Sequence, residues 1–236
     1  MDTQQLAWAA GVFDGEGSAS TYVPRRRRSP VRQIAVSQKG TSQAPDLLIR
    51  FQEAIGGLGH IHGPYRGQLY YWNSKRHAVA DTVTELLWPY LSSPKRHQLS
   101  RCAYRVGRCV PDAPAITELD TELAWSAGFF CAEGTIGIAR REGRSYVTLS
   151  VPQASVDGIP EALVRFRAVH GGVIRGPRLV PSPWSKRPQY RWQLGRAALV
   201  ARSLREVLPL MDAHKRAQAE IALRLPGLVS QDERGS

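Results

Sequence analysis

Cysteine is scarce in this chain of 236 residues, which contains Cys102, Cys109 and Cys131 and no Cys-x-x-Cys pair. An odd number of cysteines without paired spacing argues against a disulfide framework or a zinc ribbon. The sequence also lacks a long apolar run that would span a membrane and a basic-plus-apolar signal peptide. We therefore expect a cytoplasmic protein, and 42% hydrophobic residues suffice for a core in one or two small domains.

Acidic residues are sparse in two segments of the chain, which makes the charge uneven. Residues 17–80 contain ten Lys or Arg against two Asp or Glu, and residues 135–200 contain eleven against three. Each segment therefore carries a net charge of +8, in a chain whose total is +12. Two basic segments at corresponding places favour one extended polyanion that contacts both halves, whereas scattered solubilising charge is the alternative.

One short sequence is present twice, 117 residues apart: residues 6–17 are LAWAAGVFDGEG, and residues 123–134 are LAWSAGFFCAEG. Each copy ends in a carboxylate and a glycine, with Glu16 in the first copy and Glu133 in the second. A repeat that keeps one acid per copy suggests that pseudo-symmetry brings two carboxylates together. Such a pair is one way to build a paired-metal or paired-acid site.

The similarity between the two halves extends beyond this motif. Each half continues with an alternating apolar run, an amphipathic stretch, a Gly-Pro turn, a Tyr-x-Trp segment and a Lys-Arg-x-Gln segment. These patterns predict helix, two strands, helix, two strands and helices in each half. We predict subdomains at 1–110 and 118–236, joined by a linker over 111–117 in which Pro111 and Pro114 disfavour helix.

The two motifs are predicted to form helices over Thr3–Phe13 and Glu118–Phe130, ended by the glycines that follow each acid. Side chains that can cap them are those of Asp2 or Thr3 and of Thr117 or Asp120. Small residues at 7, 10, 11, 124, 127 and 128 would let two helix backbones approach closely. If the two helices pack on each other, their C-terminal ends place Glu16 and Glu133 side by side.

Residues that alternate between apolar and polar predict half-buried strands at Val31–Gln38 and Val147–Gln153. A polar sheet face flanked by basic residues suits a DNA groove. We expect the Arg25–Arg28 run to be a loop that contacts phosphates, with a solvated loop or a basic tag as the alternative. Strand parity and the basic loop predict the following residues as contacts with DNA: Ser20, Tyr22, Arg25, Arg26, Arg27, Arg28, Gln33, Ala35, Ser37, His62, Arg66, Gln68, Tyr70, Trp72, Gly137, Ala139, Arg141, Thr148, Ser150, Arg175, Tyr190 and Trp192. The tyrosines and tryptophans among them are equally compatible with packing in the core.

The chain resembles the monomeric, two-motif LAGLIDADG homing endonucleases. The resemblance is carried by AGVFDGEG at 10–17 and AGFFCAEG at 127–134, and it covers nearly the whole chain. It implies an α+β fold of two pseudo-symmetric αββαββα subdomains, each a curved antiparallel sheet packed on helices, with the motif helices at the interface. It further implies a monomer, nucleoid-associated when bound, that cleaves double-stranded DNA at a long asymmetric site and takes part in intron homing.

The resemblance also implies roles for six residues. Glu16 and Glu133 would bind a divalent metal, Gln38 and Gln153 would order water near it, and Lys95 and Lys215 would position or activate solvent. Hard oxygen ligands favour Mg²⁺, with Mn²⁺ as a substitute, and Ca²⁺ is expected to bind without supporting cleavage. Asp14 matches an earlier acid of the motif, a helix-end residue that Cys131 replaces in the second copy.

Three other interpretations stay open. The first is a DNA- or RNA-binding protein of the same fold that does not cleave, such as a maturase or a regulator. The second is a structural pseudo-dimer whose motif helices only pack, which would leave two matched acids without a cation. The third is a zinc site built from His60, His97, Cys102 and Cys109, whose spacing is irregular. Both motif carboxylates and both lysines are present, which favours the nuclease.

Overall fold

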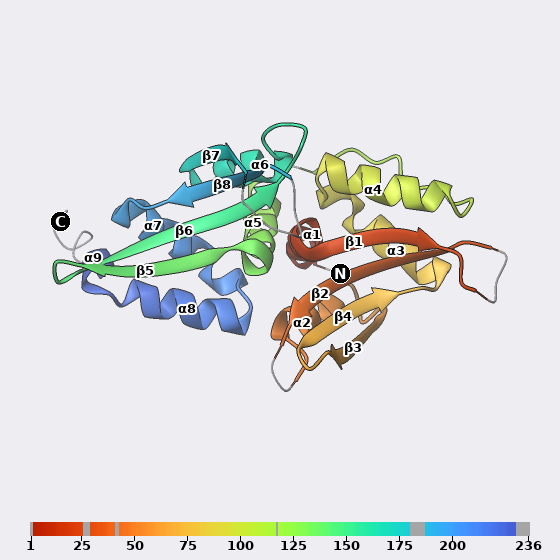
Figure 1. Cartoon of the computed structure of the whole chain (residues 1–236), viewed down its shortest axis with the longest axis horizontal. Helices are drawn as coiled ribbons and strands as arrows, with labels where there is room; N and C mark the ends of the chain where they lie inside the picture. The colour runs from red at the N-terminus through yellow and green to blue at the C-terminus, as the bar shows by residue number, and fades with distance from the viewer. Residues whose placement is uncertain (1, 26–28, 41–42, 117, 180–186, 230–236) are drawn as a thin grey trace. The chain divides into compact units, whose positions relative to one another are not determined.

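The computed structural model describes residues 2–25, 29–40, 43–116, 118–179 and 187–229 (Figure 1). The chain divides into two compact units, Met1–Ala132 and Glu133–Ser236, here called the N unit and the C unit. The predicted subdomains 1–110 and 118–236 delimit the sequence repeat, and they stay a prediction. In the described part of the chain, no helix is both long enough and apolar enough to cross a membrane.

Each unit has one four-stranded antiparallel sheet, and the strand orders are equivalent: β1-β2-β4-β3 and β5-β6-β8-β7. The N unit consists of α1 (Thr3–Glu16), β1 (Gly17–Tyr22), β2 (Val31–Lys39), α2 (Asp46–Ala54), β3 (His60–Tyr65), β4 (Leu69–Ser74), α3 (His77–Leu87), the 3₁₀ helix η1 (Trp88–Tyr90), α4 (Ser93–Tyr104) and most of α5 (Leu119–Glu133). The C unit continues with β5 (Thr135–Arg141), β6 (Arg144–Ala154), α6 (Glu161–His170), β7 (Val173–Arg178), β8 (Gln189–Leu194), α7 (Ala197–Val207), η2 (Leu208–Leu210), α8 (Ala213–Leu223) and α9 (Pro226–Val229). The repeated αββαββα order is therefore confirmed.

The two motif helices run longer than predicted and end at the acids themselves. Helix α1 begins after Asp2, whose carboxylate accepts a hydrogen bond from the Gln4 backbone N–H at 3.0 Å, as expected of an N-cap. It ends at Glu16, three residues beyond the predicted Phe13, and α5 ends at Glu133. Of the predicted caps of α5, Asp120 lies in the first turn and Thr117 falls outside the described residues.

Within the N unit, α1 and α5 touch through their backbones. A Cβ atom placed on Gly11 would overlap the Trp125 carbonyl, and one placed on Gly128 would overlap the Trp8 carbonyl. The two contacts are reciprocal, because the positions correspond in the two copies of the motif. The predicted close packing of small residues is confirmed, and it explains why α5 belongs to the same compact unit as α1.

The inner face of each sheet packs on helices through a tryptophan. Trp72 and Trp192 are fully buried, and each meets a helix phenylalanine edge to face, at 4.9 Å from Phe51 and 4.7 Å from Phe166. Tyr70 and Tyr190 lie on the same inner faces and are also buried. Four predicted DNA contacts are therefore wrong, because these side chains fill the core: Tyr70, Trp72, Tyr190 and Trp192.

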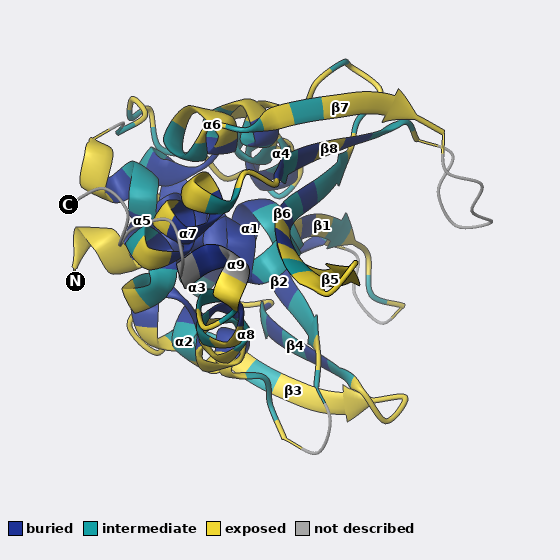
Figure 2. Cartoon of the chain, turned by 90° about the vertical axis from the view of Figure 1, so that its left-hand side faces the viewer, coloured by how far each residue is buried: buried dark blue, intermediate teal, exposed yellow. Residues whose placement is uncertain are grey.

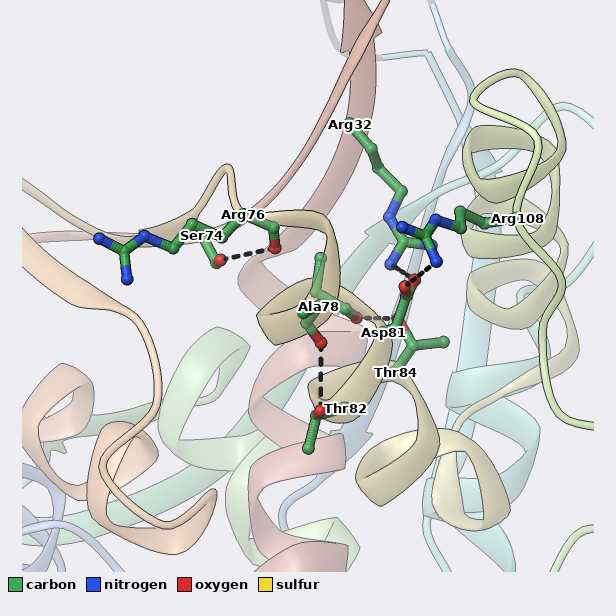
Figure 3. Close-up of polar contacts among 9 residues, drawn as sticks. Arg32, Ser74, Arg76, Ala78, Asp81, Thr82, Thr84 and Arg108 are labelled. Carbon is green, nitrogen blue, oxygen red and sulfur yellow. Dashed lines mark hydrogen bonds and ion pairs between the residues drawn. The ribbon is translucent and has the colours of Figure 1, made fainter.

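A buried ion pair joins β2 to α3 in the N unit (Figure 3). The Arg32 side chain of β2 is fully buried and places Nη2 2.5 Å from Oδ1 of Asp81 on α3. Arg108 approaches the other carboxylate oxygen of Asp81 at 3.7 Å. The Nε and Nη1 atoms of Arg32 have no hydrogen-bond partner among the described residues. The equivalent positions in the C unit are Val147 and Ala201, which are both buried and apolar.

Candidate active site and nucleic-acid interface

In the N unit, the structure brings one predicted acid and one predicted lysine together. Glu16 is half-buried at the end of α1, and the Lys95 ammonium donates a 2.6 Å hydrogen bond to the carbonyl oxygen of the next residue, Gly17. Burial raises the pKa of Glu16, and the charge of Lys95 opposes this shift to a smaller extent. The carboxylate accepts no hydrogen bond from the other described residues, so it is desolvated and left available to a cation.

The C unit repeats this arrangement with its own residues. Glu133 is half-buried at the end of α5, and the Lys215 ammonium donates a 2.8 Å hydrogen bond to the Gly134 carbonyl. The two acids and two lysines therefore form two equivalent pairs, one in each unit. That Glu16 and Glu133 lie next to each other stays a prediction.

Asp14 fixes the helix that carries Lys95. Its buried carboxylate accepts hydrogen bonds from the Ser92 hydroxyl at 2.7 Å and from the Ser92 backbone N–H at 3.0 Å, at the start of α4. It also accepts one from the Trp125 indole at 2.8 Å, which joins α1 to α5. Because Lys95 lies in the first turn of α4, this network sets where its ammonium reaches. Burial raises the pKa of Asp14, and the Ser92 hydroxyl is the largest opposing influence.

The C unit holds its lysine by a different cap. At the position of Ser92 it has Asp212, whose carboxylate accepts a 2.9 Å hydrogen bond from the Lys215 backbone N–H and caps α8. At the position of Asp14 the second copy of the motif, on α5, has Cys131, which is buried. One acid per unit therefore fixes the helix that carries the lysine. In the N unit this acid is Asp14 on the motif helix α1, and in the C unit it is Asp212 at the start of the lysine helix α8 itself. The sequence interpretation of Asp14 as a helix-end residue did not include this role.

The two predicted glutamines lie at equivalent places in the sheets. Gly17 pairs with Val36 in the register of β1 and β2, so Gln38 lies two residues past the point where α1 enters the sheet. In the C unit, Thr135 pairs with Ser150 in the same way that Ser18 pairs with Ala35 in the N unit. Gln153 of β6 therefore lies at the same place in its sheet as Gln38 does. Both glutamines are half-buried. Two residues span about 6.6 Å along a strand, which puts each glutamine within a side chain's length of the helix end.

A divalent cation fits the motif carboxylates. Each is the last residue of its helix, where the helix dipole disfavours negative charge, and Glu16 is in addition desolvated. In the described part of the chain, no group of three or more His, Cys, Asp or Glu is arranged to hold a metal ion. One or two carboxylates, with water and substrate phosphates for the remaining positions, is the ligand set typical of Mg²⁺.

The open face of the N unit's sheet carries polar and aromatic side chains. Rows of residues across the strands share this face, because paired residues of antiparallel strands point to the same side. Of the predicted contacts, Ser20 pairs with Gln33, and Ser37 lies in a row with Tyr71 and His62. The face also includes two predicted contacts, Tyr22 and Ala35, and two residues that strand parity missed, Tyr71 and Asn73. The predicted contact Gln68 lies in the β3–β4 turn and is exposed.

The open face of the C unit's sheet is polar and basic. The predicted contacts Gly137 and Thr148 pair across β5 and β6, as do Ala139 with Tyr146 and Arg141 with Arg144. Ser150 lies opposite Gln193, while Arg175 lies opposite Arg191. Figure 2 shows the edge strands β3 and β7 mostly in yellow, as exposed elements. Strand parity missed Gln189, Arg191 and Gln193 because the Tyr-x-Trp pattern of β8 predicts the opposite face, and it missed Arg178 because of a bulge in β7.

Two predicted basic contacts lie in turns. Arg66 occupies the β3–β4 turn with a φ of 50°, and it is exposed. Arg25 is exposed at the end of the described part of the β1–β2 connection. Arg26, Arg27 and Arg28 fall outside the described residues.

Comparison of the fold with solved structures is decisive where comparison of sequences is not. No protein-family model and no curated protein matches the chain. The LAGLIDADG homing endonuclease I-GzeII in complex with its DNA target matches with a TM-score of 0.63 and 12% identity, over 91% of this chain and 87% of that one. The meganuclease I-SmaMI bound to uncleaveable DNA matches with a TM-score of 0.61 and 14% identity, over 91% and 88%. I-SmaMI bound to uncleaved DNA with calcium ions matches with a TM-score of 0.56 and 13% identity, over 94% and 91%.

The chain has the LAGLIDADG homing endonuclease fold. The match covers both units, so the repeat inferred from the sequence corresponds to the two halves of this fold. In the LAGLIDADG fold of this chain, the motif helices are α1 and α5, and the motif acids are their last residues.

Proposed function

We propose that this protein is a site-specific, metal-dependent endonuclease that hydrolyses both strands of double-stranded DNA. The observation that carries the proposal is the repeated pair of a half-buried carboxylate and a lysine, Glu16 with Lys95 and Glu133 with Lys215. A protein that only bound DNA would gain nothing from a desolvated carboxylate at a helix C-terminus, where it repels phosphates. The repulsion turns into attraction once a cation is bound.

In this proposal Glu16 and Glu133 hold Mg²⁺, and each unit acts on one DNA strand. The bound metal supplies Lewis-acid stabilisation of the phosphate and lowers the pKa of water. Lys95 and Lys215 provide a fixed positive charge beside the scissile phosphate, because their ammonium groups are held on the Gly17 and Gly134 carbonyls. Gln38 and Gln153 orient the attacking water from the neighbouring strand.

The basic, polar sheet faces form the DNA interface of the proposed enzyme. Their exposed residues differ between the two units at most equivalent positions, so the target of a monomer is long and asymmetric. Contacts in the loops hold phosphates, whereas side chains of the strands contact base edges in the major groove. That I-GzeII and I-SmaMI are bound to DNA in their solved structures supports this assignment.

The first test is selection from a randomised duplex library, with cleavage measured in Mg²⁺, Mn²⁺ and Ca²⁺. The unmodified chain is expected to cut one long asymmetric site in Mg²⁺ and Mn²⁺, and to bind that site without cutting in Ca²⁺. Glu16→Gln and Glu133→Gln are the matched variants, because each removes one charge and keeps the size of the side chain. Both are expected to bind the site and to lose double-strand cleavage.

The possible results separate the alternatives. Selective binding without cleavage in any metal would overturn the nuclease and favour a maturase or regulator on the same fold. Cleavage that persists in both glutamine variants would overturn the assignment of the carboxylates. An absence of selective DNA binding would overturn the function as a whole.

A further inference from the structure

Three arginines of the C unit surround one hollow on the open face of its sheet. Arg175 and Arg178 come from the edge strand β7, and Arg191 comes from the adjacent strand β8. The hollow has a volume of about 480 Å³, and its lining also includes Gln189 and Gln193. All three arginines are exposed.

A bulge in β7 puts Arg175 and Arg178 on the same face. Side chains three residues apart in a regular strand point to opposite sides. Here the register shifts between them, so that Arg175 pairs with Arg191 while Arg178 pairs with Gln189, two residues along β8. Gly176 makes the shift possible, because its φ is 127° and a Cβ there would lie 3.1 Å from Tyr190. The backbone therefore brings the three guanidinium groups to one side.

No residue that the structure describes neutralises the arginine cluster. Neither β7 nor β8 contains an acidic residue, and no ion pair from another described residue reaches these three side chains. Arg175 and Arg191 are direct cross-strand neighbours, an arrangement that disfavours folding through repulsion. Such a cost is offset when a polyanion or an acceptor-rich surface covers the face.

The N unit has no arginine at the equivalent positions. The residues that correspond to Arg175, Arg178 and Arg191 are His62, Tyr65 and Tyr71. The two tyrosines meet edge to face with ring centroids 5.6 Å apart. The chemistry of the two open faces therefore differs most at this place, with forked cations in one unit and aromatic rings in the other.

We propose that Arg175, Arg178 and Arg191 determine specificity by contacting guanines in the DNA half-site of the C unit. The inference rests on the proposed function and deepens it, because it names the bases that one sheet recognises. Arginine donates two parallel hydrogen bonds to O6 and N7 of guanine, an edge that no other base presents in the major groove. Arg175 and Arg191 lie inside their strands, from which side chains reach the groove floor, and Arg178 ends β7 on the same face. The half-site of the N unit lacks this guanine requirement at the symmetry-related base pairs.

The test is selection of bound duplexes from a randomised library in Ca²⁺, with three variants. The unmodified chain is expected to select guanine at two or more neighbouring positions of one half-site. Arg191→Tyr, which installs the residue found at position 71, is expected to lower the preference for guanine at one of them about tenfold or more. Arg191→Gln is expected to change the preferred base there to adenine, a gain that a misfolded protein cannot give. Arg167→Tyr removes one charge from the exposed helix face of the same unit, and is expected to select the same site as the unmodified chain.

The outcomes distinguish this inference from the proposed function. Selection of a site without guanine at these positions would overturn the inference and leave the endonuclease intact. Equal weakening of all sequences by Arg191→Tyr, with a salt slope lower by about one, would identify a phosphate contact and also overturn it. Failure of the unmodified chain to select any site would instead count against the proposed function itself.

Discussion

Asp14 and Cys131 occupy the same position in the two copies of the motif, and the acid organises its surroundings. The partners of Asp14 are Ser92 and Trp125, which lie 78 and 111 residues away in the chain. Nothing in the motif itself identifies these partners, so the sequence predicts only a helix end at Asp14. In the structure, Asp14 joins three helices, α1, α4 and α5, through buried hydrogen bonds. The indole of Trp8, the counterpart of Trp125 in the first copy, is buried and lacks a hydrogen-bond partner among the described residues.

Replacement of Asp14 by asparagine tests this network. The carboxylate accepts from three donors, whereas an amide would turn its NH₂ group toward at least one of them. We expect Asp14→Asn to lower the free energy of unfolding by about 1–3 kcal/mol, measured by urea denaturation at pH 7. Asp112→Asn, an exposed acid of the same unit, is the control and should have no measurable effect. Equal stability of the two variants would contradict the crossing role of Asp14.

The two lysines allow a test of activity strand by strand. Because Lys95 belongs to the N unit and Lys215 to the C unit, each is expected to serve one DNA strand. Replacement by methionine keeps the length of the side chain and removes the charge. We expect Lys95→Met to slow cleavage of one strand by about 10²–10³-fold and Lys215→Met that of the other, so that oppositely nicked duplexes accumulate. Strand-specific labels in a gel assay measure this.

A control separates this effect from a general loss of positive charge. Lys75→Met removes an exposed lysine of the N unit, and it should leave both cleavage rates unchanged. DNA affinity in Ca²⁺ is expected to change little in the Lys95 and Lys215 variants. An equal loss on both strands from either single variant would contradict the assignment of one lysine to one strand.

Among the elements, β2 and α3 of the N unit are joined by an ion pair, whereas their counterparts β6 and α7 of the C unit carry buried apolar residues at the same positions. Removing one partner of a buried ion pair leaves an uncompensated charge, whereas replacing both partners by apolar groups costs little. We expect Asp81→Ala to lower the free energy of unfolding by about 3–5 kcal/mol, because Arg32 stays fully buried. Thermal and urea unfolding measure the effect.

The C unit supplies the compensating change. Arg32→Val with Asp81→Ala reproduces Val147 and Ala201, and this double variant is expected to recover most of the stability lost in Asp81→Ala. Recovery indicates that the pair is a replaceable part of the core. A double variant as unstable as Asp81→Ala would show instead that Arg32 and Arg108 hold the packing of β2 on α3 through contacts other than the charge pair.

Across the whole molecule, the repeat predicted more than the local patterns did. Two copies of one motif at fixed register were enough to predict two equivalent αββαββα halves and the positions of Glu16 and Glu133. Strand parity succeeded in regular strands, as at Gln33 and Thr148. It failed at Tyr70, Trp72, Tyr190 and Trp192, because aromatic residues suit both faces of a sheet. It also cannot detect a bulge, so Arg178 was missed.

The two units are also expected to lose different amounts of folding stability in acid, because the C unit has a histidine, His170, at a position where the N unit has an apolar residue. Its imidazole packs on Phe166 and accepts or donates a 2.7 Å hydrogen bond with the Ser203 hydroxyl. Burial lowers the pKa of His170 to about 4, and Glu206 opposes the shift to a smaller extent. The equivalent N-unit positions are Ile55 and Val83, both buried and without charge.

The direction of the effect follows from where the proton binds. Unfolded chain takes up a proton as the pH falls through 6.5, whereas the folded C unit takes it up only near pH 4, so stability falls between these values. When the pH is lowered from 7 to 4.5, we expect His170 to reduce the free energy of unfolding of the C unit by about 2 kcal/mol. His170→Ile with Ser203→Val copies the N unit and should remove this loss, and His214→Gln, an exposed histidine of the C unit, should not. Hydrogen exchange of each unit at pH 7 and pH 4.5 measures the difference, and equal acid sensitivity of the double variant and the unmodified chain would exclude His170 as its origin.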